Sequence, residues 1–209
     1  MPGWCYEWVM RLFVAVAVPV CAADELDDAV APLRQWCPGL RWTGRDAWHL
    51  TLAFLGEVTE PVCASLGPQL ERAAADCPRF SLSLGGAGAF PGAARARVLW
   101  TGVEGELAEL ESLAGCVAGG ARQAGAPPAE EGRRFQPHLT LARCREPVDV
   151  QPLVRRLSGY AGTPWTAGEI YLIRSHLPGG RPHDRPRYET LGCWPMAGSP
   201  GPGAGPLRA

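Results

Sequence analysis

The chain has 209 residues, of which 46% are hydrophobic and 20% are charged, and its formal net charge is −1. This composition argues against intrinsic disorder and is sufficient for one hydrophobic core, or for two small lobes that share an interface. No stretch reaches the roughly 20 consecutive apolar residues of a membrane-spanning helix, so we predict a soluble protein.

The N-terminal segment 10–23 combines an arginine, an apolar run and small residues, which is the outline of a secretory signal. The run is short and rich in β-branched residues, and Pro19 interrupts it. We therefore predict a buried first strand over 12–18, followed by an amphipathic helix with Asp24 at its N-cap. Residues 1–9 are predicted to form a disordered extension.

The rest of the chain alternates between helical and strand patterns. Apolar residues at helical spacing predict helices over 60–78, 105–125 and 149–158. Alternating apolar residues predict strands near 49–53, 80–84, 96–103, 138–142, 165–177 and 187–196. The glycine-rich segment 85–91 lacks the Gly-Lys-Ser/Thr ending of a phosphate-binding loop and is predicted to be a hairpin loop. Residues 197–209 are predicted to be a disordered Gly/Pro-rich tail. Because strands often follow one another directly, we expect antiparallel pairing and an α+β fold.

The eight cysteines argue against a metal-binding or disulfide-rich protein. Neighbouring cysteines are at least 14 residues apart. Zinc sites need clustered ligands, and secreted disulfide scaffolds are usually smaller and denser in cysteine. We therefore predict free thiols. We also expect a cytoplasmic protein that needs neither a metal nor a cofactor.

The pentapeptide HLTLA occurs at 49–53 and again at 138–142, so two of the four histidines begin the same short sequence. Successive side chains of a strand point to opposite faces. We therefore predict that the leucines of both copies face a core, whereas the histidines and threonines face a cleft. The cleft residues are His49, Thr51, His138 and Thr140. An internal duplication into two similar lobes would bring both pairs to one groove.

Two imidazoles that face each other can act as general base and general acid near pH 7, because histidine titrates there. The two threonine hydroxyls can hold an anion between them. A single His-x-Thr pattern on a strand is usually structural, but two identical copies in one chain are much more specific. Two histidines also suit a metal ion, yet neither pentapeptide supplies the third ligand of a zinc site.

The chain closely resembles the two-histidine phosphoesterases, and among them the RNA 2′,3′-cyclic phosphodiesterases, also called 2′-5′ RNA ligases. The matching stretches are RLFVAVAVP, WHLTLAFLGEV, GAFP, VLWTGV, RFQPHLTLAR and IYLIRSHL with RYETLGCWP. The resemblance implies a single bilobal catalytic domain over 10–196, with two pseudo-symmetric antiparallel sheets around a central cleft and helices outside. It implies a metal-independent hydrolase that opens a 2′,3′-cyclic phosphate to a 2′-phosphate, with weaker, reversible 2′-5′ joining of RNA ends.

The resemblance also implies roles for five residues. His138 is the base that activates water, and His49 is the acid that protonates the departing 3′-oxygen; the two roles exchange when the reaction runs backwards. Thr51 and Thr140 donate hydrogen bonds to the non-bridging phosphate oxygens. Arg143 also binds the phosphate, although it lies five residues after His138. On an ideal strand this odd offset places Arg143 on the core face, so a bulge or a strand end is needed.

Several alternatives stay open at this point. The substrate could be another phosphodiester, such as a 2′-5′ oligonucleotide or an ADP-ribose cyclic phosphate, or the chain could be a non-catalytic RNA-binding module. Three aromatic residues could stack on a nucleobase or belong to the core: Trp48, Phe90 and Phe135. A cluster near the C-terminus could guide an RNA backbone or form a solvated loop: Arg174, His176, Arg181, His183, Arg185 and Arg187. We expect RNA ends or nucleoside 2′,3′-cyclic phosphates as substrates, and a monomer.

Overall fold

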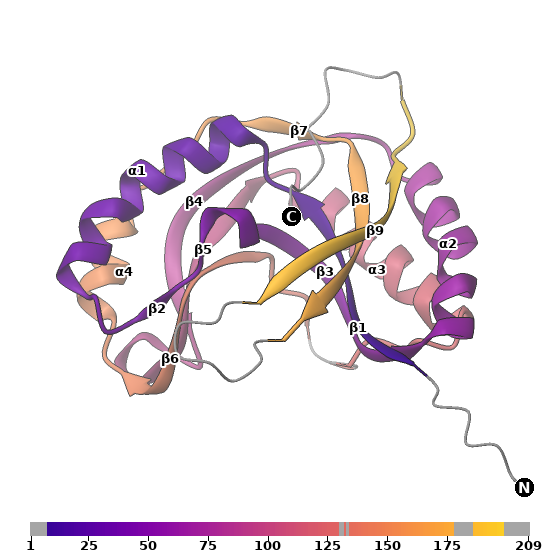
Figure 1. The fold of residues 1–209 in the computed structure, drawn as a ribbon. Helices are drawn as coiled ribbons and strands as arrows, with labels where there is room; N and C mark the ends of the chain where they lie inside the picture. The colour runs from indigo at the N-terminus through magenta and orange to yellow at the C-terminus, as the bar shows by residue number, and fades with distance from the viewer. Residues whose placement is uncertain (1–7, 130–131, 133, 178–185, 199–209) are drawn as a thin grey trace, which may run out of the picture.

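The computed structural model describes residues 8–129, 132, 134–177 and 186–198. These residues form two antiparallel sheets with helices on their outer faces (Figure 1). Most of the predicted N-terminal extension and C-terminal tail lies outside the described residues. None of the helices in the described part combines the length and apolar character needed to cross a membrane.

Each sheet contains one HLTLA strand. Sheet A has the order β3 (His49–Thr59), β1 (Val9–Ala17), β8 (Glu169–His176) and β9 (Arg187–Pro195). Sheet B has the order β2 (Arg41–Trp42), β6 (His138–Val148), β5 (Ala96–Gly105), β4 (Phe80–Phe90) and β7 (Trp165–Ala167). The first copy of the pentapeptide begins β3 and the second begins β6, so the two copies belong to different sheets.

The helices cover the outer face of both sheets. The helices α2 (Glu60–Ala75) and α3 (Leu107–Gln123) pack on sheet A, and α1 (Val20–Trp36) and α4 (Gln151–Leu157) pack on sheet B (Figure 1). Short 3₁₀ helices, Arg45–Ala47 (η1) and Ala93–Arg95 (η2), lie in the connections. The predicted α+β, bilobal architecture is therefore confirmed.

The element order shows two copies of one unit that exchange parts. The first copy is β1-α1-β3-α2-β4 and the second is β5-α3-β6-α4-β8. The last strand of each copy leaves its own sheet: β4 pairs with β5 in sheet B, and β8 pairs with β1 in sheet A. The first helix of each copy also packs on the other sheet. The two lobes are thus interlocked rather than separate domains.

The helices form where apolar residues recur every three or four positions, so that one stripe is buried. In α1 the side chains of Leu26, Val30 and Leu33 are at most 1% exposed. In α3 both Leu110 and Leu113 are fully buried. All four helices and the helix-facing sides of both sheets contribute to one hydrophobic cluster. This continuous core fixes the two sheets relative to each other.

Two predicted boundaries differ from the structure. The first helix begins at Val20, immediately after Pro19, and not at Asp24. Pro19 has no N–H for a strand ladder and forms the N-cap with an extended backbone (φ −67°, ψ 156°), so the strand ends before it and the helix begins directly after it. Asp24 instead forms an ion pair with Arg45. The single strand predicted over 165–177 is divided at Gly168, because β7 belongs to sheet B and β8 to sheet A.

The prediction of a hairpin loop for the glycine-rich segment is also wrong. Residues 85–90 continue β4, and the turn comes later, over 91–95. The reason lies on the neighbouring strand, where Trp100 pairs with Gly88 and its ring occupies the space that a side chain at Gly88 would take. A Cβ atom at Gly88 would lie 2.2 Å from two ring carbons of Trp100. Glycine is needed here to make room for an aromatic side chain, and not to form a turn.

This close approach predicts that Gly88→Ala destabilises the protein by about 1–3 kcal/mol, the usual cost of adding a methyl group to a packed region. Gly92→Ala is the matched control, since a Cβ there meets no atom within 4 Å and should change stability by less than about 0.5 kcal/mol. Urea unfolding measures both variants. Equal stability of Gly88→Ala and wild type would contradict the packing described for Trp100.

Candidate active site

The two HLTLA strands have the same pattern of burial. In each strand the histidine and threonine are partly exposed, and the residues that follow them are buried. The exposed fractions of the leucines are 2% for Leu50, 6% for Leu52 and 0% for both Leu139 and Leu141. The predicted division into a core face and an open face is therefore confirmed for both copies.

A one-residue bulge occurs at the same place in both copies. The pairing of β3 with β1 shifts at Leu52, and the pairing of β6 with β5 shifts at Leu141. Each leucine is the fourth residue of its pentapeptide and has no direct partner on the neighbouring strand. Such a bulge places two successive side chains on the same face. Accordingly, Ala53 and Ala142 are buried together with the leucines that precede them.

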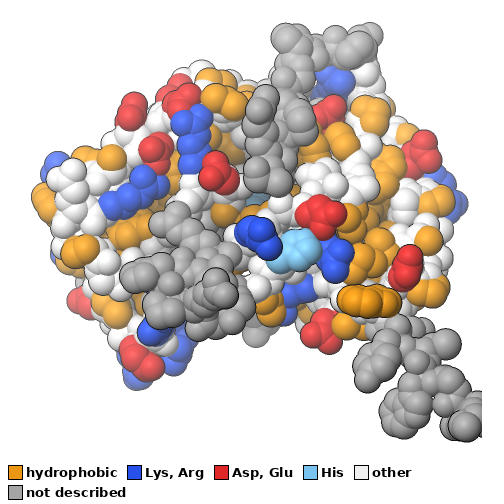
Figure 2. Space-filling model, viewed as in Figure 1, with side chains coloured by type: hydrophobic (Ala, Val, Ile, Leu, Met, Phe, Trp, Pro, Cys, Tyr) orange, Lys and Arg blue, Asp and Glu red, His pale blue; other side chains and the backbone are white. Residues whose placement is uncertain are grey.

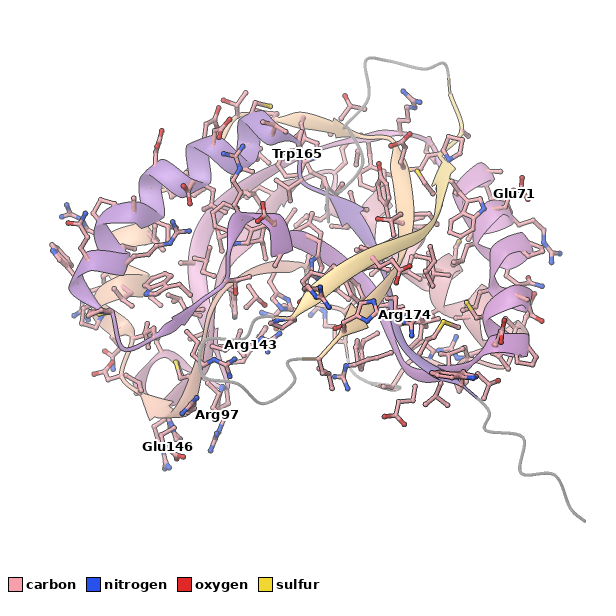
Figure 3. The ribbon with its side chains drawn as sticks, viewed as in Figure 1. Glu71, Arg97, Arg143, Glu146, Trp165 and Arg174 are labelled. Atoms are coloured by element: carbon pink, nitrogen blue, oxygen red, sulfur yellow. The ribbon has the colours of Figure 1, made fainter. Side chains whose placement is uncertain are left out.

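The bulge in β6 explains how Arg143 reaches the open face of its strand. After the extra residue, the alternation of faces is restored with opposite phase, and Arg143 returns to the side of His138 and Thr140. Its side chain is exposed. The positive charge of Arg143 acts on His49, which belongs to the other sheet. Arg143 therefore faces both HLTLA strands; Figure 3 labels it on β6.

The His49 ring is enclosed by aromatic side chains of sheet A. Its centroid lies 4.6 Å from that of Phe13, in a stacked arrangement, and 5.3 Å from that of Tyr188, edge to face. Burial lowers the pKa of His49 to about 4; a backbone hydrogen bond to Ala47 opposes this, and the positive charges of Arg143 and His138 add to it. In the ligand-free site His49 is therefore neutral at pH 7.

His138 is oriented by its own backbone. Its Nδ1 lies 2.8 Å from the carbonyl oxygen of Gln136. Because a carbonyl only accepts hydrogen bonds, Nδ1 carries the proton in this arrangement and Nε2 carries the lone pair in the neutral ring. His49 contacts the backbone of Ala47, which is likewise two residues upstream. The Phe90 ring meets the His138 ring edge to face, with the centroids 5.0 Å apart.

Tyr188 lies against His49, and the sequence predicted no role for it. It lies on β9, and its ring contacts both Phe13 and His49. Burial raises the pKa of Tyr188, while the nearby charges of Arg143 and Arg11 oppose that rise. The phenol is thus protonated at neutral pH and available as a hydrogen-bond donor. No local pattern pointed to it, because its contact with His49 joins β9 and β3, which are the two edge strands of sheet A.

Other candidates lie away from the two histidines. Trp48 is only 2% exposed and belongs to the hydrophobic core. Phe135 is partly buried and packs against this core. Tyr188 on β9 pairs with Ser175 on β8, so the next residue, His176, lies on the opposite face of sheet A. There its Nε2 is 2.9 Å from a carboxylate oxygen of Glu189. Figure 2 shows a histidine beside acidic and basic side chains near the middle of the visible surface. Arg181, His183 and Arg185 lie outside the described residues.

Within residues 8–129, 132, 134–177 and 186–198, no group of three or more His, Cys, Asp or Glu side chains is close enough to hold a metal ion. The seven cysteines of these ranges are free thiols. The side chains that surround the two histidines are instead aromatic rings, threonines and arginines. Such a set suits an anion that carries an organic group, because it combines hydrogen-bond donors and positive charge with flat apolar surfaces.

The sequence model of the 2′-5′ RNA ligase superfamily matches residues 22–178, which is most of the chain. The chain belongs to the 2′-5′ RNA ligase superfamily. Its 189-residue alignment with the RNA 2′,3′-cyclic phosphodiesterase of Geobacillus stearothermophilus has 31% identity and covers 90% of this chain but 58% of that protein. The protein of the same name from Thermus thermophilus is 34% identical, with 92% and 93% of the two chains covered. The solved structure of E. coli LigT in its apo form superposes with a TM-score of 0.69 at 27% identity, covering 91% of this chain and 99% of that one.

The lowered pKa of His49 predicts that the protein loses stability as the pH falls. An unfolded histidine titrates near pH 6.5, so between about pH 6.5 and pH 4 the unfolded chain binds a proton that folded His49 excludes. The free energy of unfolding decreases in this window by at most about 1.4 kcal/mol per pH unit. Between pH 7 and pH 5, the free energy of unfolding measured with urea should therefore fall by up to about 2 kcal/mol less in His49→Gln than in wild type.

Gly92→Ala is the control, because it changes no titratable group and a Cβ there meets no atom within 4 Å. This variant should follow the wild-type pH dependence. If His49→Gln and wild type lost stability in parallel, the ring would not be held neutral by the folded site.

Proposed function

We propose that this chain hydrolyses 2′,3′-cyclic phosphates at RNA ends to 2′-phosphates, with His49 and His138 as the acid and base. The observation that carries the proposal is the convergence of two HLTLA strands from different sheets, which brings His138 and Arg143 close enough to act electrostatically on His49. Two relatives named RNA 2′,3′-cyclic phosphodiesterase, whose alignments cover most of this chain, support the substrate class.

In the proposed reaction a water molecule attacks the phosphorus atom in line with the 3′-oxygen. His138 accepts the proton of this water at Nε2, which is the basic nitrogen when Nδ1 donates to Gln136. As the bond between phosphorus and the 3′-oxygen breaks, His49 donates a proton to the departing oxygen. The products are a free 3′-hydroxyl and a 2′-phosphate, and the two histidines have exchanged protonation states.

His49 is neutral in the empty site, so its role as acid requires the substrate. The cyclic phosphate carries one negative charge, and an opposite charge within a few ångströms favours the protonated imidazole. Binding of the phosphate beside Arg143 therefore raises the pKa of His49 from its low value in the ligand-free site. The substrate thus supplies the charge that prepares its own acid.

Thr51, Thr140 and Arg143 have the task of holding the phosphate in this proposal. Thr51 and Thr140 lie next to the histidines on the cleft face of each strand, and both are partly exposed. Their hydroxyls and the guanidinium of Arg143 are proposed to donate to the non-bridging oxygens, where negative charge develops during attack. Removing one donor of this kind typically costs about 10²–10³ in rate.

The same geometry accommodates joining of RNA ends. If the 5′-hydroxyl of a second RNA takes the place of water, the same acid and base lead to a 2′-5′ phosphodiester and a 3′-hydroxyl. The superfamily takes its name from this reaction. As part of the same proposal, the enzyme acts as a monomer in the cytoplasm and needs neither metal nor cofactor.

A substrate with sulfur in place of the 3′-oxygen separates the two histidines. On the oxygen substrate, His49→Ala and His138→Ala should each lower kcat/KM by about 10²–10⁴. A thiol is far more acidic than an alcohol, so the sulfur leaves without a proton from an acid. On the sulfur substrate the loss caused by His49→Ala should shrink at least tenfold, whereas the loss caused by His138→Ala should persist.

The assay is run with EDTA, which also tests the proposed independence of metal. Recovery of His138→Ala in place of His49→Ala would show that the roles are reversed. Equal losses on both substrates would exclude His49 and His138 as an acid–base pair with divided roles. Activity that disappeared with EDTA and returned with zinc or manganese would overturn the mechanism.

A further inference from the structure

We propose that Arg11, held over the ring of Phe54, binds the internucleotide phosphate that precedes the cyclic end, so that this chain prefers oligonucleotides to mononucleotides. We call Arg11, Phe54 and Tyr188 the Arg11 subsite. This inference rests on the proposed function, because it assigns a second phosphate position to the same cleft. Four features of the described residues carry it.

The first feature is position. Arg11 lies two residues before Phe13 on β1, so both side chains point to the same face of sheet A. Phe13 is the ring that stacks on His49. A rise of about 3.3 Å per residue places Arg11 about 7 Å along the strand from Phe13. This separation resembles that of neighbouring phosphates along a nucleic acid chain.

The second feature is a difference between the two lobes. Phe54 follows His49 by five residues and lies just beyond the bulge, as Arg143 does in the other strand. One lobe thus presents an arginine from the HLTLA strand itself. The other presents an aromatic ring at the equivalent position, and Arg11 of the neighbouring strand covers it, with Cζ 4.5 Å from the ring centroid.

The third feature is the availability of the guanidinium group. A guanidinium held by its face against a ring keeps its edge N–H groups for a phosphate. In the part of the chain that the structure describes, Arg11 has no hydrogen bond and no ion pair. Glu57 stands opposite Arg11 in the β1–β3 pairing, and it forms no ion pair with Arg11. The donors of Arg11 are therefore not occupied by a described carboxylate.

The fourth feature is continuity with the phosphate site. Tyr188 contacts His49, and the charges of Arg11 and Arg143 both act on its phenol. Tyr188 therefore connects the two arginines across the cleft face. A chain with two successive phosphates can place one beside Arg143 and the histidines and the other beside Arg11, with the Tyr188 hydroxyl between them as a donor.

The test compares adenosine 2′,3′-cyclic phosphate with a diadenylate that ends in the same cyclic phosphate. Wild type should have a kcat/KM for the dinucleotide at least about tenfold higher, the value of one charged hydrogen bond. Arg11→Gln should lower this ratio about tenfold, and Arg11→Lys, which keeps the charge, should lower it less. The wild-type dependence of log kcat/KM on log salt should be steeper for the dinucleotide by about 0.7, for one additional phosphate.

Arg174→Gln is the matched control. Arg174 lies on β8 opposite the core residue Leu12, on the other face of the same sheet, and forms an ion pair with Glu189 (Figure 3). This variant should leave the ratio unchanged. If Arg11→Gln lowered activity on both substrates equally, or on neither, Arg11 would only cover Phe54 and the inference would fail. If wild type acted on neither substrate, the proposed function itself would fail.

Discussion

One extra residue at the fourth position of each HLTLA copy determines which side chains face the histidines. Without the bulge at Leu141, strict alternation would direct Arg143 into the core, where an unpaired guanidinium is costly. With the bulge, two small or branched apolar residues fill the core in succession, and the arginine joins His138 and Thr140. The same bulge at Leu52 brings Phe54 to the cleft. The same bulge thus occurs in both halves of the site. The halves differ in the residue that follows it, which is Phe54 in β3 and Arg143 in β6.

The two halves also differ beside their threonines. Thr51 pairs with Ala15 on β1, whereas Thr140 pairs with Trp100 on β5. The large ring of Trp100 fits because β4 has glycine where a side chain would collide with it. Sheet B therefore supplies the aromatic wall beside His138, and sheet A the enclosed ring of His49. This asymmetry fits the proposed reaction, in which one imidazole accepts a proton and the other, whose pKa burial lowers, is proposed to become the acid when the phosphate binds.

The repeated pentapeptide predicted the architecture well because its information is local and periodic. Alternation of leucine with histidine and threonine specified the two faces, and the offset of Arg143 indicated that a bulge was needed. Tyr188 was not predictable, since its contact with His49 depends on how the whole of sheet A brings its two edge strands, β9 and β3, together. The glycine-rich segment was misread as a loop because the cause of its glycines, Trp100, lies on another strand. Exchange of β4 and β8 between the lobes likewise follows from packing of the whole molecule.

The central claim is that both HLTLA strands hold one phosphate. A crystal structure of the complex with adenosine 2′-phosphate, the product of the proposed reaction, tests it most directly. We predict a phosphate group within hydrogen-bonding distance of the hydroxyls of Thr51 and Thr140 and of the guanidinium of Arg143, with His49 and His138 on opposite sides of the phosphorus atom. A phosphate that contacted the residues of only one strand, or that lay outside the space between β3 and β6, would contradict the account.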